Sequence, residues 1–275
     1  MKRILPLAVV LALLSTPAWA VLDLGGKFVQ GGIVTGRAEP EASVTLDGKP
    51  VPVRPDGRFF VGFGRDQAAT AELVVSHPDG HVDTVPLIIE QREYDIQKID
   101  GLPDQMVTPD EATLARIAEE RSLVEVARAV DSSEPYFDAG FAWPAIGPVS
   151  GVYGSQRILN GEPRQPHFGI DIAVPEGTPV GAAAPGTVTL AQDLYFTGNT
   201  VIIDHGYGIS TTYSHLRKML VAVGDKVNQG EQVGEVGATG RATGPHLDWR
   251  LNLFEIRLDP ALVVGPMPEP ALAKQ

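Results

Sequence analysis

Short alternating runs of apolar and polar residues, separated by turn residues, fill the chain after residue 20. A strand with one buried face repeats every two residues, so this period predicts β-strands. The dipeptide Asp-Gly closes three of the runs at the spacing of a small β-sandwich, which we expect over residues 21–95. The expected strands are Lys27–Thr35, Ser43–Leu46, Val51–Val53, Arg58–Gly62, Ala71–Ser76 and Val82–Glu90.

A single helix is predicted after this domain. Thr108 is suited to cap it, Pro109 fits its first turn, and Glu111 completes a capping box. An approximate 3.6-residue apolar stripe continues to about Val130, where polar residues and a proline end it. We expect residues 96–140 to form a helical connector whose helix packs against one of the chain's own domains rather than against a partner.

The β pattern returns near Ala142, with Gly and Pro between the runs and no long helical period. These features predict a mostly antiparallel β-domain over residues 141–265, followed by a tail at 266–275. The predicted class of the whole chain is mainly β. The expected strands lie at or around Val180, Val188, Thr200–Ile203, Ile209–Tyr213, Val221–Val223, Val227, Gln232–Val236 and His246–Phe254.

Residues 1–20 have the pattern of a secretory signal peptide. Two cations precede an apolar stretch at residues 4–14 that is too short to span a bilayer, and residues 18–20 form a small-x-small cleavage site. We therefore expect export across the inner membrane, removal of residues 1–20, and no stable membrane insertion afterwards. A bacterial periplasm suits such a chain.

Composition excludes several kinds of chemistry and partner. The chain has no cysteine, which rules out disulfides and thiolate metal ligands. Its formal net charge is −12, and no cluster of Lys and Arg stands out in the sequence. Nucleic acid is therefore not an expected partner, because phosphate neutralisation needs clustered cations. Charge-driven binding to an anionic membrane is disfavoured for the same reason.

Polar residues from three separate stretches could converge on one metal ion. His167 and Asp171 lie in PHFGIDIA, His215 lies in TTYSHL, and His246 and Asp248 lie in TGPHLDWR, in a chain with only six histidines. Imidazole and carboxylate are ordinary zinc ligands, and a hydrolytic zinc site needs three protein ligands and an open position. The remaining side chains can move protons. The pattern predicts a metallohydrolase.

The spacing of these residues restricts the local backbone. His167 and Asp171 would be about 13 Å apart in a straight strand, too far for one ion, so the chain must bend near Gly169. His246 and Asp248 share one face of a strand, with Cα atoms about 6–7 Å apart. One of these two can bind the ion while the other stands beside the open position.

In this order, the residues resemble the lysostaphin/LytM family of zinc peptidases that cut peptidoglycan peptides. The resemblance covers residues 151–260 and includes HFGIDIAVPEGTPV, TVIIDHGYGISTTYSHL and VGDKVNQGEQVGEVGATGRATGPHL. It implies a compact duplicated β-fold, one zinc ion, and peptidoglycan peptides as substrate. It also implies that His167 and Asp171 bind zinc, while His215 and His246 are unligated catalytic histidines.

One position departs from the family pattern. The family usually has His-x-His where this chain has His246-Leu247-Asp248, so the third ligand would be Asp248. Carboxylate binds zinc well, although two carboxylates formally cancel the ion's charge and should acidify its bound water less. Alternatively, Asp248 pairs with Arg250 and the chain is a catalytically degenerate LytM-like regulator, or a cell-wall binding protein, that activates other wall hydrolases. The remaining residues fill every role that a site needs, so we expect an active zinc metalloendopeptidase.

Other candidate features favour structural interpretations. His77 and His81 flank a turn and are expected to be loop histidines rather than a metal pair. The Gly-rich loop at 237–244 precedes a strand and not a helix N-terminus, so it lacks the means to cradle phosphate. His205 belongs to no ligand set of the family and is expected to be structural. Tyr213 is not assigned to the family's auxiliary tyrosine.

Overall fold

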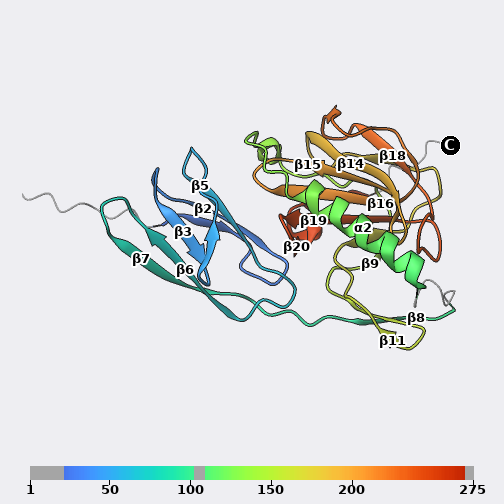
Figure 1. Cartoon of the computed structure of the whole chain (residues 1–275), viewed down its shortest axis with the longest axis horizontal. Helices are drawn as coiled ribbons and strands as arrows, with labels where there is room; N and C mark the ends of the chain where they lie inside the picture. The colour runs from blue at the N-terminus through green and yellow to red at the C-terminus, as the bar shows by residue number, and fades with distance from the viewer. Residues whose placement is uncertain (1–21, 102–108, 270–275) are drawn as a thin grey trace, which may run out of the picture.

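The computed structural model describes residues 22–101 and 109–269. Two β-rich lobes lie side by side along the long axis of the molecule, the smaller formed by the N-terminal strands (Figure 1). The expected signal peptide at residues 1–20 lies outside the described residues. No helix within the described ranges is both long enough and apolar enough to cross a membrane.

Two antiparallel sheets form the N-terminal lobe and enclose one core. The orders are β1-β2-β5 and β4-β3-β6-β7. Alternation along β5 turns Phe59 and Val61 into this core, where they meet Val44 and Leu73 of the other sheet. The strands are β1 (Leu24–Gly26), β2 (Ile33–Arg37), β3 (Ser43–Leu46), β4 (Lys49–Val51), β5 (Arg58–Gly62), β6 (Thr70–Ser76) and β7 (Val82–Ile88).

The two lobes share an apolar interface. Phe60 belongs to a different cluster from Phe59 and Val61, as expected for alternate residues of a strand. It packs with residues of the larger lobe, including Tyr207 and Leu251. The Phe60 and Tyr207 ring centroids are 6.0 Å apart. The N-terminal lobe is therefore docked on the larger lobe and does not hang from it as a free module.

A ten-stranded sheet forms the larger lobe, with the order β17-β14-β15-β16-β19-β12-β9 and with β13, β18 and β20 attached to this path. Its pairings are antiparallel, so the predicted mainly β, antiparallel class is confirmed. The strands are β9 (Val149–Gly151), β12 (Ile170–Ile172), β13 (Pro179–Gly181), β14 (Gly186–Leu194), β15 (Gly198–Asp204), β16 (Ile209–Met219), β17 (Lys226–Val227), β18 (Gln232–Val236), β19 (Leu247–Leu253) and β20 (Ile256–Leu258). Two short 3₁₀ helices flank it, η1 (Tyr136–Ala139) and η2 (Pro260–Leu262).

The segment at 96–140, expected to be a helical connector, begins with a strand. β8 (Ile96–Ile99) pairs in parallel with β10 (Gln156–Leu159), which pairs with β11 (Glu162–Pro163). In Figure 1 the extended chain leading to β8 runs from the N-terminal lobe along the lower side of the larger lobe. The chain thus contributes a small separate sheet beside the C-terminal one.

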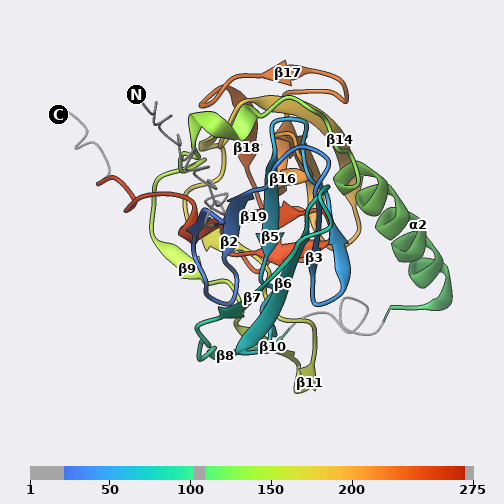
Figure 2. The same ribbon diagram turned by 90° about the vertical axis from the view of Figure 1, so that its left-hand side faces the viewer.

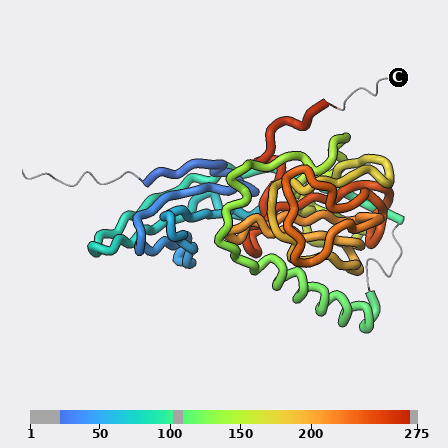
Figure 3. The backbone as a smooth tube through the Cα atoms, turned by 90° about the horizontal axis from the view of Figure 1, so that it is seen from above, coloured from blue at the N-terminus to red at the C-terminus, as the bar shows by residue number. Residues whose placement is uncertain are grey.

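Helix α2 (Glu111–Arg128) lies along one flank of the larger lobe (Figures 2 and 3). It packs on β14 and β15, as expected for a helix that covers its own domain. Its N-cap is Asp110, whose carboxylate accepts a hydrogen bond of 2.8 Å from the Thr113 N–H. The predicted cap at Thr108, a residue outside the described ranges, is therefore wrong.

The expected strand at Val221–Val223 is also wrong. β16 ends at Met219, and the Ala222 N–H is bonded to the Asp225 side chain at 2.8 Å. Apolar residues here belong to a turn leading into β17, because a local side-chain acceptor satisfies the backbone without a strand partner.

Candidate metal centre and catalytic groove

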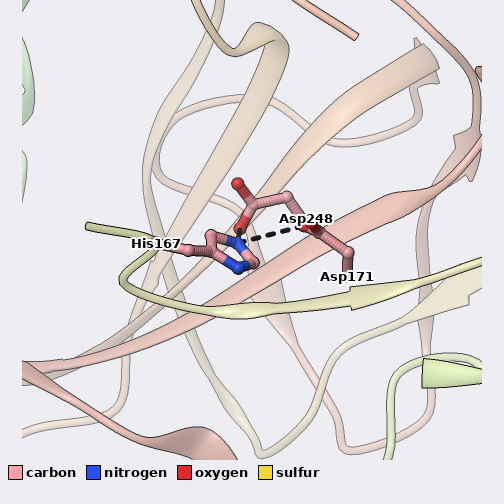
Figure 4. Close-up of side chains that lie close together, drawn as sticks. All are labelled: His167, Asp171 and Asp248. Carbon is pink, nitrogen blue, oxygen red and sulfur yellow. Dashed lines mark ion pairs between the residues drawn. The ribbon is translucent and has the colours of Figure 1, made fainter. Parts of the chain in front are cut away.

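His167, Asp171 and Asp248 lie together, and each offers one ligand atom within 4.8 Å of the others (Figure 4). His167 Nε2 is 3.0 Å from Oδ1 of Asp171 and 3.6 Å from Oδ1 of Asp248. Asp171 on β12 and Asp248 on β19 stand directly opposite each other in the strand register. The strand pairing therefore brings together two residues that are far apart in the sequence, and the histidine completes the group.

The bend that the sequence requires is built from backbone contacts. The His167 N–H donates to the Ser155 carbonyl at 2.8 Å, and its own carbonyl accepts from the Gly154 N–H at 2.7 Å. Gly169 then passes so close to β19 that a Cβ atom there would lie 2.6 Å from the Trp249 carbonyl oxygen. A glycine is needed at 169 because the backbone of one strand takes the space of a side chain on the other.

The donor set of this cluster fits one divalent metal ion. The exposed fractions of His167, Asp171 and Asp248 are 1%, 6% and 0%. Nδ1 of His167 is buried without a hydrogen-bond partner among the described residues, and His167 Nε2 and Asp171 Oδ1 face each other at 3.0 Å outside hydrogen-bonding geometry. Like charges directly opposed across strands are also destabilising. A cation bound by these atoms would satisfy the polar groups and offset the repulsion.

Each carboxylate of the cluster also pairs with an arginine. Arg250 donates from Nε to Oδ1 of Asp248 at 2.9 Å, and from Nη2 to Oδ2. Arg157 donates from Nη2 to Oδ2 of Asp171 at 3.1 Å. Asp248 thus pairs with Arg250, as the alternative in the sequence analysis supposed, and at the same time lies in the cluster. The two arrangements do not exclude each other.

The arginines keep both carboxylates ionised. Burial alone would raise the pKa of Asp248, but the charge and hydrogen bonds of Arg250 hold this pKa well below its usual range. Burial would likewise raise the pKa of Asp171, yet His167 and Arg157 lower it. Ionised carboxylate is the form that binds a metal, so both carboxylates of the cluster are in their ligating state at neutral pH.

His215 and His246 lie side by side in a groove of about 260 Å³ that Asp171 also lines. Their ring centroids are 4.7 Å apart. Nδ1 of His215 is 2.8 Å from the Thr239 carbonyl, and Nδ1 of His246 is 2.8 Å from the Gly244 carbonyl. Because a carbonyl can only accept, Nδ1 carries the hydrogen in each ring, and Nε2 is left to accept a proton. His246 Nε2 is 3.8 Å from Asp171 Oδ1, so it faces the cluster.

His215 is held in an unusual backbone conformation. Its φ is 62°, in the left-handed region that non-glycine residues seldom adopt. Its N–H donates to the Thr197 carbonyl at 2.8 Å. Burial lowers the pKa of His215 to about 4, so its ring is neutral at pH 7. A strained backbone of this kind persists where the surrounding structure holds the residue in place, and such residues cluster at functional sites.

The groove includes residues that the sequence analysis did not find. The Gly-rich loop at 237–244 supplies the carbonyls that orient both catalytic-candidate histidines, and the Gly237 carbonyl accepts from the His246 N–H at 3.2 Å. Gln97 and Ile99 of β8 line the same groove. No local pattern signals these contacts, since they depend on pairings between distant segments.

His205 and Tyr213 lie away from the groove. His205 is fully buried, with Nδ1 2.7 Å from the Pro185 carbonyl and Nε2 2.7 Å from the Thr211 hydroxyl. The Tyr213 hydroxyl is also buried and accepts from the Ala183 N–H at 2.7 Å. Both side chains are satisfied within the core, so neither reaches the cluster. His205 is structural, as its sequence context suggested.

His77 and His81 are also placed as loop residues. Nε2 of both rings lies on the Asp83 carboxylate, at 3.0 and 2.9 Å, and Nδ1 of His77 lies 2.6 Å from Glu39. These contacts tie a turn of the N-terminal lobe to neighbouring strands.

Comparison with known proteins gives consistent matches over this region. A family model, Peptidase family M23, matches residues 165–260. The peptidoglycan DD-endopeptidase ShyA of Vibrio cholerae is 46% identical over 86 residues, which cover 31% of this chain and 20% of ShyA. The DD-carboxypeptidase/endopeptidase Mpg of Neisseria meningitidis is 44% identical over 103 residues, 38% of this chain and 24% of Mpg. The chain thus spans about a fifth to a quarter of the length of these curated relatives.

A solved structure extends the match to almost the whole chain. A peptidase M23 protein from Pseudomonas aeruginosa is 31% identical, with a TM-score of 0.66, and the alignment covers 87% of this chain and 96% of that one. The similarity therefore includes the N-terminal lobe as well as the region of the metal cluster. With this coverage, and with the family model matching the segment that carries the cluster, the chain belongs to peptidase family M23.

Proposed function

We propose that this chain is an exported zinc metalloendopeptidase that hydrolyses peptide bonds in peptidoglycan, acting in the bacterial periplasm. The observation that carries the proposal is the cluster of His167, Asp171 and Asp248 beside two histidines with available Nε2 atoms. The relatives named as peptidoglycan endopeptidases support the substrate. The pattern of residues 1–20 supports export.

In this proposal His167, Asp171 and Asp248 hold the ion. Zinc, when bound, supplies a Lewis acid for the scissile carbonyl and lowers the pKa of a bound water. Nε2 of either His215 or His246 accepts the proton of the attacking water. The other ring of the pair stabilises the oxyanion or protonates the leaving amine. The carbonyl partners at Nδ1 fix the tautomer that these proton transfers need.

A second candidate function is a non-catalytic regulator of other wall hydrolases. The observation that favours it is the pairing of Arg250 with both oxygens of Asp248, with Arg157 on Asp171. Carboxylates with such partners are stable without a cation. This candidate predicts a folded chain that takes up no metal and cuts nothing.

The test measures metal content and digestion together. The full chain, purified without chelator, is analysed for bound metal and incubated with purified peptidoglycan. We expect about one zinc per chain and release of soluble peptides, both lost in His167→Ala and in Asp248→Ala. His81→Ala, which removes a histidine from the distant N-terminal lobe, should retain both. Digestion that persists after His167→Ala would overturn the proposal, and a wild-type chain without metal or digestion would favour the regulator.

A further inference from the structure

One face of the small sheet formed by β8, β10 and β11 lines the catalytic groove, the space of about 260 Å³ beside the metal cluster. Side chains alternate between the two faces of a strand, and in-register neighbours on parallel strands share a face. The groove residues of this sheet follow that rule, because they form the in-register pairs Gln97 with Arg157 and Ile99 with Leu159. The residues between them, all within the described part of the chain, do not line the groove. The small sheet therefore forms one wall of the groove.

Arg157 shows how close this wall lies to the metal cluster. Its Nη2 donates to Oδ2 of Asp171 at 3.1 Å, so β10 is one side chain away from the cluster. On β8, the neighbouring strand about 4.8 Å away, Gln97 stands beside Arg157. An extended peptide advances about 3.3 Å per residue. A peptide that runs from the cluster along this wall therefore reaches Gln97 within about one or two residues.

Gln97 has an amide that the described protein leaves unused. Its Oε1 is buried and accepts no hydrogen bond from any described residue. A buried polar atom without a partner costs free energy, and a ligand that supplies the missing donor recovers it. The peptide N–H of a substrate is such a donor. Gln97 is therefore placed to bind the backbone of a peptide that enters the groove.

Apolar side chains continue the lining beyond this amide. Ile99 and Leu159 come next on the same face of the small sheet, and Ala173, Ala242 and Pro245 line the groove with them. A surface of this kind gains affinity when it buries an apolar side chain of the ligand.

We propose that the small sheet selects the substrate: Gln97 accepts a hydrogen bond from a substrate peptide N–H, and Ile99 with Leu159 contacts the apolar side chain next to it. This inference rests on the proposed peptidase function. It names the substrate class as an extended peptide with an apolar side chain about one or two residues from the bond that is cut. The residues of this wall all precede residue 165, where the family-model match begins. Substrate preference is then set partly by a segment outside that match.

Peptide binding without turnover tests the role of Gln97. The full chain, stripped of metal by chelator, is titrated by calorimetry with a purified peptidoglycan peptide. Gln97→Met keeps the length of the side chain but removes the amide, so we expect Kd to rise about three- to tenfold. Gln192→Met makes the same change at an exposed position of β14 that does not line the groove, and it should leave Kd unchanged. An equal Kd for wild type and Gln97→Met would overturn the assignment.

Ester analogues identify the group that Gln97 recognises. In each analogue one peptide N–H is replaced by an ester oxygen, which removes a donor and keeps the side chains. The analogue without the recognised N–H should bind wild type about three- to tenfold more weakly, and should bind wild type and Gln97→Met equally. If every analogue still distinguishes wild type from Gln97→Met, no backbone N–H is recognised and the inference fails.

The apolar part of the wall is tested by changing the peptide side chain. Synthetic peptides carry alanine or glycine next to the recognised N–H. Wild type should bind the alanine peptide about fourfold more tightly, because one more methyl group is buried. Ile99→Ala should reduce this preference. Ile96→Ala, on the same strand but on the other face and 63% exposed, should keep it. A preference that survives Ile99→Ala unchanged would refute the apolar contact.

Digestion assays separate this inference from the proposed function. Gln97→Met should raise KM for peptidoglycan peptides with little change in kcat and no change in bound metal, since Gln97 is not part of the cluster. Faster digestion by Gln97→Met would show that the small sheet obstructs the groove, which contradicts the inference. Digestion that depends on neither Gln97 nor Ile99 would overturn this inference alone. Gln97-dependent binding by a chain that digests nothing would overturn the peptidase function, with peptide recognition retained.

Discussion

Arg250 is the residue whose removal tests the charge balance of the metal cluster most directly. Asp248 is fully buried, lies opposite Asp171, and accepts hydrogen bonds from Arg250 at both oxygens. Arg250→Gln keeps an amide donor but removes the positive charge. Breaking one side of a buried ion pair costs about 3–5 kcal/mol, because the remaining charge is left uncompensated. We expect this loss in the free energy of unfolding of the metal-free protein, measured in urea.

Bound zinc should restore part of that loss. The cation gives Asp248 a second source of positive charge, so the variant gains more stability from zinc than wild type does. By linkage, a ligand that stabilises the folded variant more must also bind it more tightly. We expect at least a tenfold lower zinc Kd for Arg250→Gln, which corresponds to about 1.4 kcal/mol. Competition with a chelator of known affinity measures it.

A surface pair supplies the control. Arg116 lies 2.6 Å from Glu120 on helix α2, with its side chain 49% exposed. Arg116→Gln should cost less than about 1 kcal/mol, since solvent screens such pairs. The reasoning about Arg250 is refuted if its replacement costs no more than this control. It is also refuted if zinc binds Arg250→Gln more weakly than wild type.

Four further outcomes are expected. Replacing His215 or His246 by alanine should lower peptidoglycan turnover about 10²–10⁴-fold with bound metal unchanged by elemental analysis, and loss of the metal would contradict their unligated role. Gly151→Ala should weaken metal binding in a chelator titration, because its Cβ would collide with the Asp171 carboxylate. Burial lowers the pKa of His205 to about 4 from 6.5, so roughly 3 kcal/mol of stability present above pH 6.5 should be lost as pH falls to 4. Urea unfolding of wild type and His205→Asn across this range should differ in slope. Deleting the two N-terminal sheets but keeping β8 should leave hydrolysis measurable, and a folded, metal-binding fragment that cuts nothing would contradict this.

The motifs in the sequence grouped five candidate residues, and the resemblance to the lysostaphin/LytM family separated the expected ligands from His215 and His246. His167 and Asp171 required a bend, and Gly169 is the residue at which the backbone passes closest to β19. The two-residue repeat of a β-strand predicted that Asp248 and His246 lie on the same face of one strand. Such local geometry depends on residues that are close in the sequence, so it can be predicted from the sequence.

The partners of the cluster were less accessible. Arg157 lies on β10 and donates a hydrogen bond to Asp171. The parallel partner of β10 is β8, which lies in the segment expected to be a helical connector. That pairing is between segments about sixty residues apart, and neither carries a distinctive strand pattern. A cavity beside His167 was missed for the same reason, since the arginines that line it are scattered along the chain and only the fold gathers them.

Asp248 and Arg250 act as one unit in the electrostatics of the site. A neutral histidine at 248, the usual family ligand, would leave one carboxylate, Asp171, to face the ion. The aspartate adds a second negative charge, and the bidentate Arg250 returns one positive charge beside it. The formal sum over Asp171, Asp248 and Arg250 is then −1, the same as for Asp171 with a neutral histidine, and Arg157 beside Asp171 adds one positive charge in both cases. The bound water should therefore be acidified more than two bare carboxylates would allow. An aspartate at position 248, where the family usually has histidine, is thus not by itself a sign of a lost site. Arg250, two residues along the same strand, compensates the charge of Asp248.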